Sequence, residues 1–448
     1  MMKVCIVGGG AGGWMAATAL RKIAKVTLID SSKISSIGVG ESTTGIFDDF
    51  INKYFDTTKF VRESDAAMKY GVYYKNWGRK DYIHPFQRET AYERNNITRR
   101  EFSKLLLGKD QDTHIHEIVN TEMWKFVRNN HVSLDPEEHP HSWHFNAGKF
   151  ILFMKDEIEG DINYINETVI GSESVDGKIQ HVITESDQKI EADYFIDCCG
   201  THEVFGDEYI DLSSYLLCDK AVVYPLPYEN KREQFHPYTI AKTMNHGWRW
   251  ITPTWSRIGT GYVFSSRHAS TDECIDELER DIGKKDLNVR VVDFQPRINK
   301  TPFKPNSFSI GMSQGFLEPL DAPGLSLTIR SINKIVDLLE KEGAKDFSEH
   351  NRYQNFDYYW WASFILSQYK FCHREDTLFW MDQKNVKCPF YEEILEMIFS
   401  DKIDFDYEMF LYTMAAKDVK LFDGDPQKIL ELNTPLMHHY DVIERCHQ

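Results

Sequence analysis

The sequence predicts an α/β fold, and features of the first thirty residues carry that prediction. Lys3–Val7 is a short apolar run with strand composition, and the glycine-rich turn 8–13 follows it directly. Residues 14–23 have helical propensity and spacing, and a second apolar run, 26–29, ends at Asp30. Strand, G-x-G-x-x-G turn, helix, strand and acid together form the fingerprint of a dinucleotide-binding fold. A glycine-rich turn without function is the alternative for the turn alone.

Each position of the turn has a physical role in that reading. Gly8 permits the tight turn, Gly10 lets the backbone approach a pyrophosphate, and Gly13 lets helix and strand pack closely. The N–H groups at the helix start, from Ala11 onward, would bind the pyrophosphate, because the helix dipole favours negative charge there. Asp30 is placed to accept hydrogen bonds from a ribose.

Composition excludes several partner classes. The chain has 448 residues, with 52 Lys and Arg against 69 Asp and Glu, so its formal net charge is −17. Nucleic acid and anionic membrane are therefore disfavoured as main partners. The eight cysteines contain no C-x-x-C pair, apolar runs are short, and the histidines of 138–144 lack a second ligand cluster. We expect a cytoplasmic protein with no signal peptide before the first strand, no membrane span and no metal.

The chain shows no repeat, linker or low-complexity tract, so we predict one compact unit, 1–448, with a discontinuous nucleotide-binding part. That part covers about 1–62, 150–230 and 300–345. A substrate cap covers about 63–149 and 346–448, and a β-rich section lies between them at 231–299. Among single elements, we expect one strand over 189–196 and an amphipathic helix over 271–282.

Two stretches outside the turn carry candidate chemistry. Trp248 and Trp250 alternate in a predicted strand, so both indoles share one face and form a rigid wall. Two core tryptophans in a sheet are the alternative. Lys69 lies among apolar and aromatic neighbours, and desolvation there would lower its pKa. On sequence alone, a solvated lysine on an exposed strand face is the commoner arrangement.

A third stretch precedes a predicted helix. Glu318 and Asp321 lie three residues apart, and Gly324 stands at the helix start, where an anion could bind. Acids placed there for the helix dipole are the alternative. His84 could line a substrate site, although a surface histidine is the commoner reading.

These stretches and the opening turn resemble the flavin-dependent halogenases, especially the tryptophan halogenase branch. Residues 37–41 (I-G-V-G-E) resemble the family's second flavin-contacting segment, and Trp248, Trp250 and Pro253 match its W-x-W-x-I-P signature. Similarity continues through nearly the whole chain in order, including the segments 141–145, 195–198, 215–219, 316–320 and 374–380.

The resemblance implies an FAD-binding Rossmann-like fold of the glutathione reductase or flavin monooxygenase type, with an interwoven, largely helical substrate-binding cap. It also implies a set of FAD contacts. These are Gly8, Gly10, Ala11, Gly13, Asp30, Ile37, Val39, Glu41, Val169, Met312 and Leu325.

The implied reaction uses reduced FAD, delivered by a separate flavin reductase, and O2 to oxidise a bound halide to hypohalous acid. Lys69 would relay the halogen to a small electron-rich aromatic substrate of the phenol or indole type. Asp321 takes the place of the family glutamate that partners the lysine. Trp248 and Trp250 would keep the substrate away from the flavin.

Departures from the family pattern refine this expectation. Thr252 replaces the signature isoleucine, Asp321 is one methylene shorter than glutamate, and Pro323 and Gly324 occupy the positions whose backbone contacts the halide. Because Pro323 has no N–H, one donor is missing, and we expect bromide or iodide to be preferred over chloride. A flavin-dependent aromatic monooxygenase is the alternative function, and a non-catalytic nucleotide-binding regulator is a third. A homo-oligomer is left open.

Overall fold

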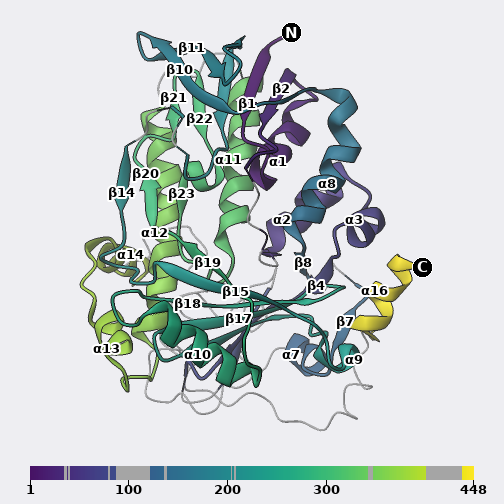
Figure 1. The fold of residues 1–448 in the computed structure, drawn as a ribbon, viewed down its shortest axis with the longest axis vertical. Helices are drawn as coiled ribbons and strands as arrows, with labels where there is room; N and C mark the ends of the chain where they lie inside the picture. The colour runs from purple at the N-terminus through teal and green to yellow at the C-terminus, as the bar shows by residue number, and fades with distance from the viewer. Residues whose placement is uncertain are drawn as a thin grey trace.

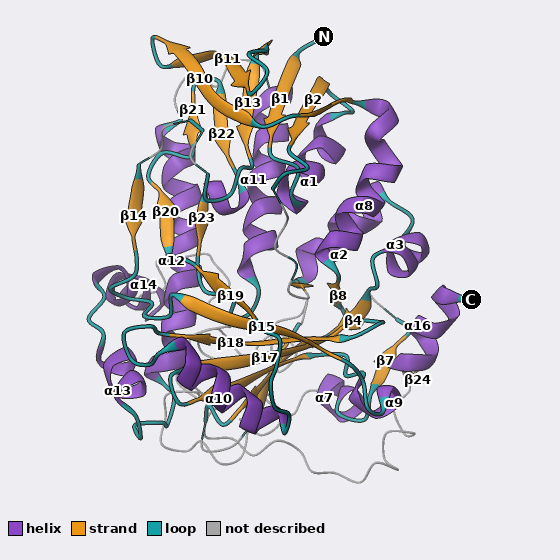
Figure 2. Ribbon diagram, viewed as in Figure 1, coloured by secondary structure: helices purple, strands orange, loops and turns teal. Residues whose placement is uncertain are grey.

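The computed structural model describes residues 1–34, 38, 41–78, 81–86, 122–135, 139–202, 204–205, 208–341, 347–399 and 436–448. Within these residues two large sheets dominate, one in the upper part and one in the lower part of Figure 1. The long helices α11 (Pro323–Glu340) and α12 (Ser348–Lys370) run along the long axis between them. Figure 2 shows the same arrangement by secondary structure, with helices beside the upper sheet.

The upper sheet has six described strands and contains the predicted nucleotide-binding unit. In spatial order they are β21 (Phe303–Lys304), β22 (Ser307–Ser309), β13 (Tyr194–Asp197), β1 (Lys3–Val7), β2 (Lys25–Asp30) and β9 (Asn163–Asn166). All neighbours from β22 to β9 are parallel. Parallel strands flanked by helices are the arrangement that the strand–turn–helix–strand pattern predicts, so the α/β fold class is confirmed.

Helices cover this sheet and join it to the rest of the molecule. α1 (Ala11–Leu20) packs against α8 (Ala147–Ile158) and α11. α11 also packs against α2 (Gly45–Tyr54) and α12. Because α1 carries small side chains over most of its length, these neighbours can approach it closely.

The lower sheet has seven described strands. In spatial order they are β19 (Arg290–Asp293), β15 (Lys220–Leu226), β18 (Ile258–Phe264), β17 (Gly247–Pro253), β16 (Thr239–Met244), β5 (Gly71–Lys75) and β6 (Tyr82–Pro85). Only β5 and β16 run parallel within this described set. β5 and β6 come from the predicted cap segment and pair with strands from the predicted β-rich section.

Smaller sheets connect these layers. The strand β4 (Ala67–Lys69) pairs with β8 (Ser142–Phe145), which also pairs with β3 (Glu41–Ser42). The remaining described strands are β10 (Val169–Val175), β11 (Lys178–Thr184), β12 (Lys189–Glu191), β14 (Tyr209–Asp211), β20 (Arg297–Asn299), β23 (Gly315–Phe316), β7 (His131–Ser133) and β24 (Leu436–His438).

The remaining described helices surround the lower sheet and the edge of the upper one. They are α3 (Thr57–Glu63), α7 (Glu122–Val127), α9 (Lys231–Gln234), α10 (Thr271–Ile282), α13 (Leu378–Asn385), α14 (Pro389–Phe399) and α16 (His439–His447), with the short 3-10 turns η1 (Glu159–Asp161) and η2 (Gly311–Ser313). None of the described helices combines the length and apolar composition that a bilayer crossing requires.

Two predicted elements had opposite outcomes. The helix predicted over 271–282 is α10, with the same bounds. The single strand predicted over 189–196 is wrong, because β12 and β13 belong to different sheets. Between them, Asp193 bonds the edge of β1, accepting from the N–H of Lys3 at 2.7 Å through its side chain. The chain therefore leaves β12 and begins β13 within a stretch whose apolar pattern reads as one continuous strand.

Candidate active site

The turn between β1 and α1 has the shape that a phosphate group requires. α1 begins at Ala11, and its N-cap residue Gly10 has no side chain to cap the first turn. A Cβ added at Gly10 would meet no atom within 4 Å, so the turn faces open space there. The first-turn N–H groups of a helix have no partner within the helix, and here they are available to an anion.

Two further glycines of the turn are required by close packing. A Cβ at Gly13 would lie 1.9 Å from the carbonyl oxygen of Gly8, so only glycine lets α1 approach β1 this closely. A Cβ at Gly9 would lie 2.0 Å from Cγ of Asp30. The acid at the end of β2 therefore lies directly against the glycine turn. These residues fit the ribose and pyrophosphate of a dinucleotide.

Val169 and Met312, predicted flavin contacts, lie at neighbouring edges of this region. Val169 begins β10 next to Thr168, whose Oγ1 is 2.7 Å from Oγ of Ser31, just after Asp30. Met312 lies in η2. A Cβ added at Gly200 would come within 3.9 Å of the Cβ of Met312. Both segments thus border the carboxyl ends of the parallel strands, where ligands bind in open α/β sheets.

The other predicted flavin contacts have mixed placements. Leu325 lies in the first turn of α11 and is partly buried. The Glu41 carboxylate accepts a hydrogen bond from the N–H of Ala147 at 2.7 Å, at the start of α8, so this side chain has a structural bond. Ile37 and Val39 lie outside the described residues.

Lys69 lies at the end of β4 and is completely buried. Its Nζ donates a hydrogen bond to the carbonyl oxygen of Thr43 at 2.8 Å and lies 4.8 Å from the ring centre of Phe86. Burial lowers the pKa of Lys69 to about 7, and the nearby charge of Asp321 opposes that decrease. The exposed lysine that is commoner on sequence grounds is therefore wrong for this position.

Asp321 is held by two side chains from β5 and β6. The Tyr74 hydroxyl donates a hydrogen bond to its Oδ2, and Nδ1 of His84 lies 3.2 Å from its Oδ1. Asp321 and Ala322 both have a left-handed backbone, with φ of 61° and 59°. Such geometry costs about 1–2 kcal/mol for most non-glycine residues and less for Asp, so Ala322 is the more strained of the two. The interpretation of His84 as a surface histidine is wrong, since it is 8% exposed.

The strand β6 and the residue after it supply ring side chains that contact both Asp321 and Lys69. Tyr82 stacks on Tyr74, with ring centres 4.8 Å apart, while His84 meets Asp321. Phe86, two residues further along, lies against the Lys69 ammonium group. Alternate residues of a strand share a face, so this one segment covers one side of the candidate centre. Nothing in the sequence marks Tyr74 and Phe86 as site residues, because aromatic residues in a strand most often belong to the core.

The tryptophan pair lies on β17. Both indoles are buried, and the ring centres of Trp248 and Trp250 are 6.4 Å apart in an edge-on contact. Trp250 packs over Gly261 of β18, where a Cβ would come within 2.1 Å of the indole Cη2. Nε1 of Trp248 donates a hydrogen bond to Oε1 of Glu318 at 3.2 Å.

Glu318 is completely buried beside this wall. Its Oε1 also accepts a hydrogen bond from the Tyr369 hydroxyl of α12 at 2.6 Å. Burial raises the pKa of Glu318 to about 7, against the lowering effect of its hydrogen-bond donors. Glu318 therefore does not serve the α11 dipole, which was the alternative on sequence grounds.

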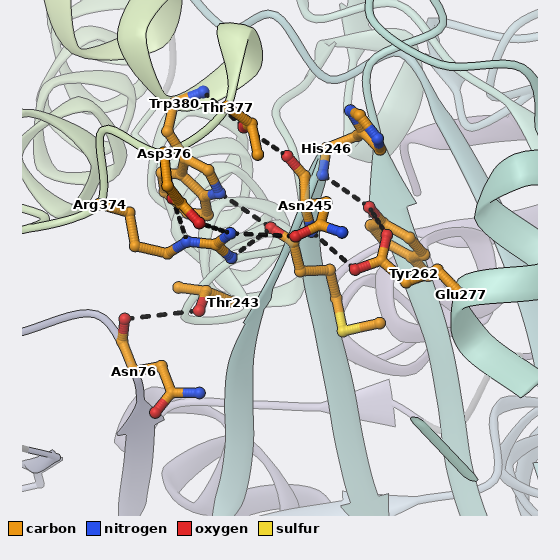
Figure 3. Close-up of polar contacts among 11 residues, drawn as sticks. Asn76, Thr243, Asn245, His246, Tyr262, Glu277, Arg374, Asp376, Thr377 and Trp380 are labelled. Atoms are coloured by element: carbon orange, nitrogen blue, oxygen red, sulfur yellow. Dashed lines mark hydrogen bonds and ion pairs between the residues drawn. The ribbon is translucent and has the colours of Figure 1, made fainter. Parts of the chain in front are cut away.

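Polar contacts fix the turn of the hairpin that carries the tryptophans (Figure 3). Arg374 donates to the carbonyl oxygen of Met244 at 2.8 Å, and the Trp380 indole donates to the same oxygen at 2.8 Å. Thr377 donates to the carbonyl oxygen of Asn245 at 2.7 Å. The 374–380 segment, which resembles the halogenase family, therefore has a positional role at this turn.

Thr43 and Thr44 connect the start of α11 to Lys69 by hydrogen bonds. Pro323 is the first helical residue, and no side chain caps this end of the helix. Oγ1 of Thr44 is 2.5 Å from Oγ of Ser326, in the first turns of α11, while the preceding carbonyl group, of Thr43, accepts from Lys69. Residues 43–44 therefore contact both the Lys69 amine and the first turns of α11, where Gly324 lies.

The structure brings most predicted catalytic side chains into one buried region. Asp321 acts electrostatically on Lys69, and both Asp321 and Glu318 help raise the pKa of Tyr74. Glu318 in turn contacts Trp248. Among the same described residues, no three His, Cys, Asp or Glu side chains are grouped so that they could hold a metal ion.

A family comparison decides the assignment. The family model described as tryptophan halogenase matches residues 3–421. The chain belongs to the tryptophan halogenase family. The resemblance drawn from the motifs is confirmed, and the protein is a flavin-dependent halogenase of the tryptophan halogenase type, a family that uses reduced FAD and O2 with a halide.

Curated relatives and solved structures agree with this family. Tryptophan 7-halogenase RebH of Lentzea aerocolonigenes is 27% identical over 469 residues, covering 94% of this chain and 85% of the relative. Tryptophan 6-halogenase SttH of Streptomyces toxytricini is 26% identical, covering 86% and 82%. The halogenase fold is shared with Xcc4156, a flavin-dependent halogenase from Xanthomonas campestris, at a TM-score of 0.84 and 22% identity, covering 99% of this chain and 98% of that one.

Proposed function

We propose that this halogenase uses Lys69 to pass an oxidised halogen to a small electron-rich aromatic substrate of the phenol or indole type, with bromide or iodide preferred over chloride. Reduced FAD would come from a separate flavin reductase. The observation that carries the proposal is the completely buried amine of Lys69, whose pKa is about 7, next to Asp321.

The residues of the glycine turn fit FAD. The open N–H groups at Gly10 and Ala11 would hold the pyrophosphate, and Asp30 would accept from the ribose. The flavin, when bound in its reduced form, supplies the electrons that activate O2 for oxidation of the halide. A separate reductase is the arrangement that membership of the halogenase family implies.

Lys69 suits either of two ways of holding the halogen. With a pKa of about 7, the ammonium and the free amine are both populated near neutral pH. The ammonium would donate a hydrogen bond to the oxygen of hypohalous acid. The amine would instead displace that oxygen, forming an N–halogen bond with loss of water. In both cases the aromatic carbon then gains the halogen and releases a proton.

The tryptophan pair would act as a barrier. The two buried indoles have little freedom to move. Glu318 holds the Trp248 ring by a hydrogen bond, and the Trp250 ring packs closely on the backbone of Gly261. Such a wall would keep the substrate from the reduced flavin, so that halogenation is favoured over hydroxylation.

The halide preference follows from the start of α11. Pro323 offers no N–H, and Ala322 offers no side-chain donor. An anion there would be bound mainly by the remaining backbone groups and the helix dipole. A reduced donor set penalises chloride most, since chloride is the most strongly hydrated of the three halides.

The test is a product assay with purified protein, a generic flavin reductase, each halide separately, and a panel of phenols and indoles analysed by mass spectrometry. We expect halide-dependent products, and Lys69→Ala should lower their rate by about a hundredfold or more while FAD still binds. Lys75→Ala is the matched control, because Lys75 lies on neighbouring β5 and is exposed.

Three results would contradict the proposal. Full halogenation by Lys69→Ala would exclude this amine as the relay. Products that gain oxygen instead of halogen would favour the aromatic monooxygenase, and FAD binding without any turnover would favour the non-catalytic regulator.

A further inference from the structure

Glu318 is a buried acid to which the proposed reaction gives no task. It is completely buried, and its Oε1 accepts from both the Trp248 indole and the Tyr369 hydroxyl. Burial raises the pKa values of Tyr74 and Cys218, and the charge of Glu318 adds to both increases. Burial of a carboxyl group costs free energy unless hydrogen bonds compensate for the lost water. The position of Glu318 beside the wall therefore calls for an explanation.

The two indoles of the wall are held by different means. Trp250 has no hydrogen-bond partner for its Nε1 among the described residues, and its ring is fixed sterically against the backbone at Gly261. Trp248 carries the hydrogen bond to Glu318, at 3.2 Å, and this N–H is the one polar group of its side chain. Loss of that bond would leave the orientation of Trp248 to packing alone.

We infer that Glu318 is a positioning residue for halogenation: it fixes the edge of the Trp248 indole and ties it, through the shared oxygen, to Tyr369 of α12. The consequence for the reaction rests on the proposed function of the wall, whereas the hold on the indole does not. When Trp248 is released, the barrier loosens, and reduced flavin is consumed without transfer of halogen to the aromatic.

The same stretch of chain supports the hairpin at two points. Tyr369 acts near the wall through Glu318, while Arg374, Thr377 and Trp380 hold the turn of the hairpin (Figure 3). Loss of the Trp380 indole N–H removes an indole hydrogen bond from the same hairpin, at the carbonyl oxygen of Met244, and leaves both hydrogen bonds of Glu318 in place. Trp380→Phe is therefore the matched control.

The experiment follows the indole N–H resonances of the full-length protein, which has ten tryptophans, by nitrogen-15 NMR, with Trp248 assigned from Trp248→Phe. In Glu318→Leu we expect the Trp248 indole proton to move upfield, because it loses its hydrogen-bond acceptor. Glu318→Gln keeps an acceptor oxygen and should restore most of the shift. Trp380→Phe should leave the Trp248 resonance in place.

The second readout is the yield of brominated indole per reduced FAD oxidised. It should fall about tenfold in Glu318→Leu, as expected for the loss of one buried hydrogen bond, and Glu318→Gln should recover most of it. The KM for indole should change less than the yield, because Glu318 acts on the wall and not on the substrate.

Three outcomes would overturn the inference: an unmoved Trp248 resonance in Glu318→Leu, a moved resonance with an unchanged yield, or an undiminished yield in Trp248→Phe. The last variant decides the question if Glu318→Leu does not fold. A wild-type protein without halogenated product would contradict the proposed function, and the resonance would still decide whether Glu318 holds Trp248.

Discussion

The glycine turn and the buried centre around Lys69 are built from different parts of the chain and suit different tasks. The turn acts through its backbone: small residues within one short stretch, 8–13, expose N–H groups and admit Asp30. The centre acts through side chains, which come from β4, β5, β6, β17 and the approach to α11. A local segment suffices for the first, whereas the second exists only in the folded protein.

This difference has an energetic side. The turn stores little electrostatic free energy, because its groups are neutral amides and one acid at the edge of the sheet. The centre buries Lys69 and Glu318 completely, and burial shifts both pKa values to about 7 from opposite directions. Desolvated ionisable groups destabilise a fold, and they persist where function requires them.

The largest effect concerns Lys69 and pH. Its pKa is about 7 in the folded protein and 10.5 ordinarily, so between these values the unfolded chain binds a proton that the folded chain does not. The contribution of Lys69 to the free energy of unfolding therefore rises with pH over this window, by at most about 1.4 kcal/mol per pH unit. Below pH 7 both states are charged, and the burial cost is fully present.

Denaturant unfolding of wild type and Lys69→Met at pH 6 to 9 measures this effect. The difference between them should be flat below pH 7 and should then favour the wild type increasingly. Lys75→Met, at an exposed position on β5, should show no such trend. A difference independent of pH for Lys69→Met would mean that the buried amine keeps its charge throughout.

A smaller effect separates packing from ligand binding within the turn. Gly13→Ala should lower the free energy of unfolding by about 3 kcal/mol, because its Cβ would overlap the carbonyl oxygen of Gly8. Gly10→Ala should change stability by less than about 1 kcal/mol, since its Cβ meets no protein atom. It should nevertheless weaken FAD binding about tenfold, because the ligand needs that space.

Thermal unfolding and FAD titration of both variants test this pair. Unchanged FAD affinity in Gly10→Ala would place the pyrophosphate elsewhere, and a stable Gly13→Ala would show that α1 can move away from β1.

The sequence predicts elements well where their determinants are local. The bounds of α10 follow from Ser270 and Glu273, which form a capping box, and from Gly283, which ends the helix in a left-handed conformation. The opening turn is equally local. In both cases the residues that decide the structure lie within a few positions of each other, so a pattern along the chain is sufficient.

The candidate site shows where such patterns fail. The resemblance to a family leads to Lys69 and Asp321, but nothing near His84 indicates that its ring meets Asp321, 237 residues away in sequence. Glu318 was interpreted through its neighbour, the helix start, whereas its partners are Trp248 and Tyr369. Contacts of this kind depend on how sheets and helices pack, which periodicity does not encode.

The smallest predicted effect lies where the two regions meet, at the start of α11. This site would bind an anion through backbone groups, as we propose for the glycine turn, but it lies beside the buried centre. Pro323→Thr restores an N–H at the first helical position, where no intrahelical acceptor exists, so the added donor is available to an anion. The ratio of chlorinated to brominated product at equal halide concentrations should rise about threefold to tenfold, equivalent to one hydrogen bond.

Ala322→Gly is the matched control for that change. Ala322 has a left-handed backbone, with φ of 59°, and glycine there relieves about 1 kcal/mol of strain without adding a donor at position 323. It should therefore stabilise the protein and leave the ratio of halogenated products unchanged. If Ala322→Gly shifts the ratio as much as Pro323→Thr does, the preference comes from the flexibility of this turn. If neither variant shifts it, the halide is selected elsewhere in the site. The start of α11 would then resemble the glycine turn in its backbone but would not bind an anion.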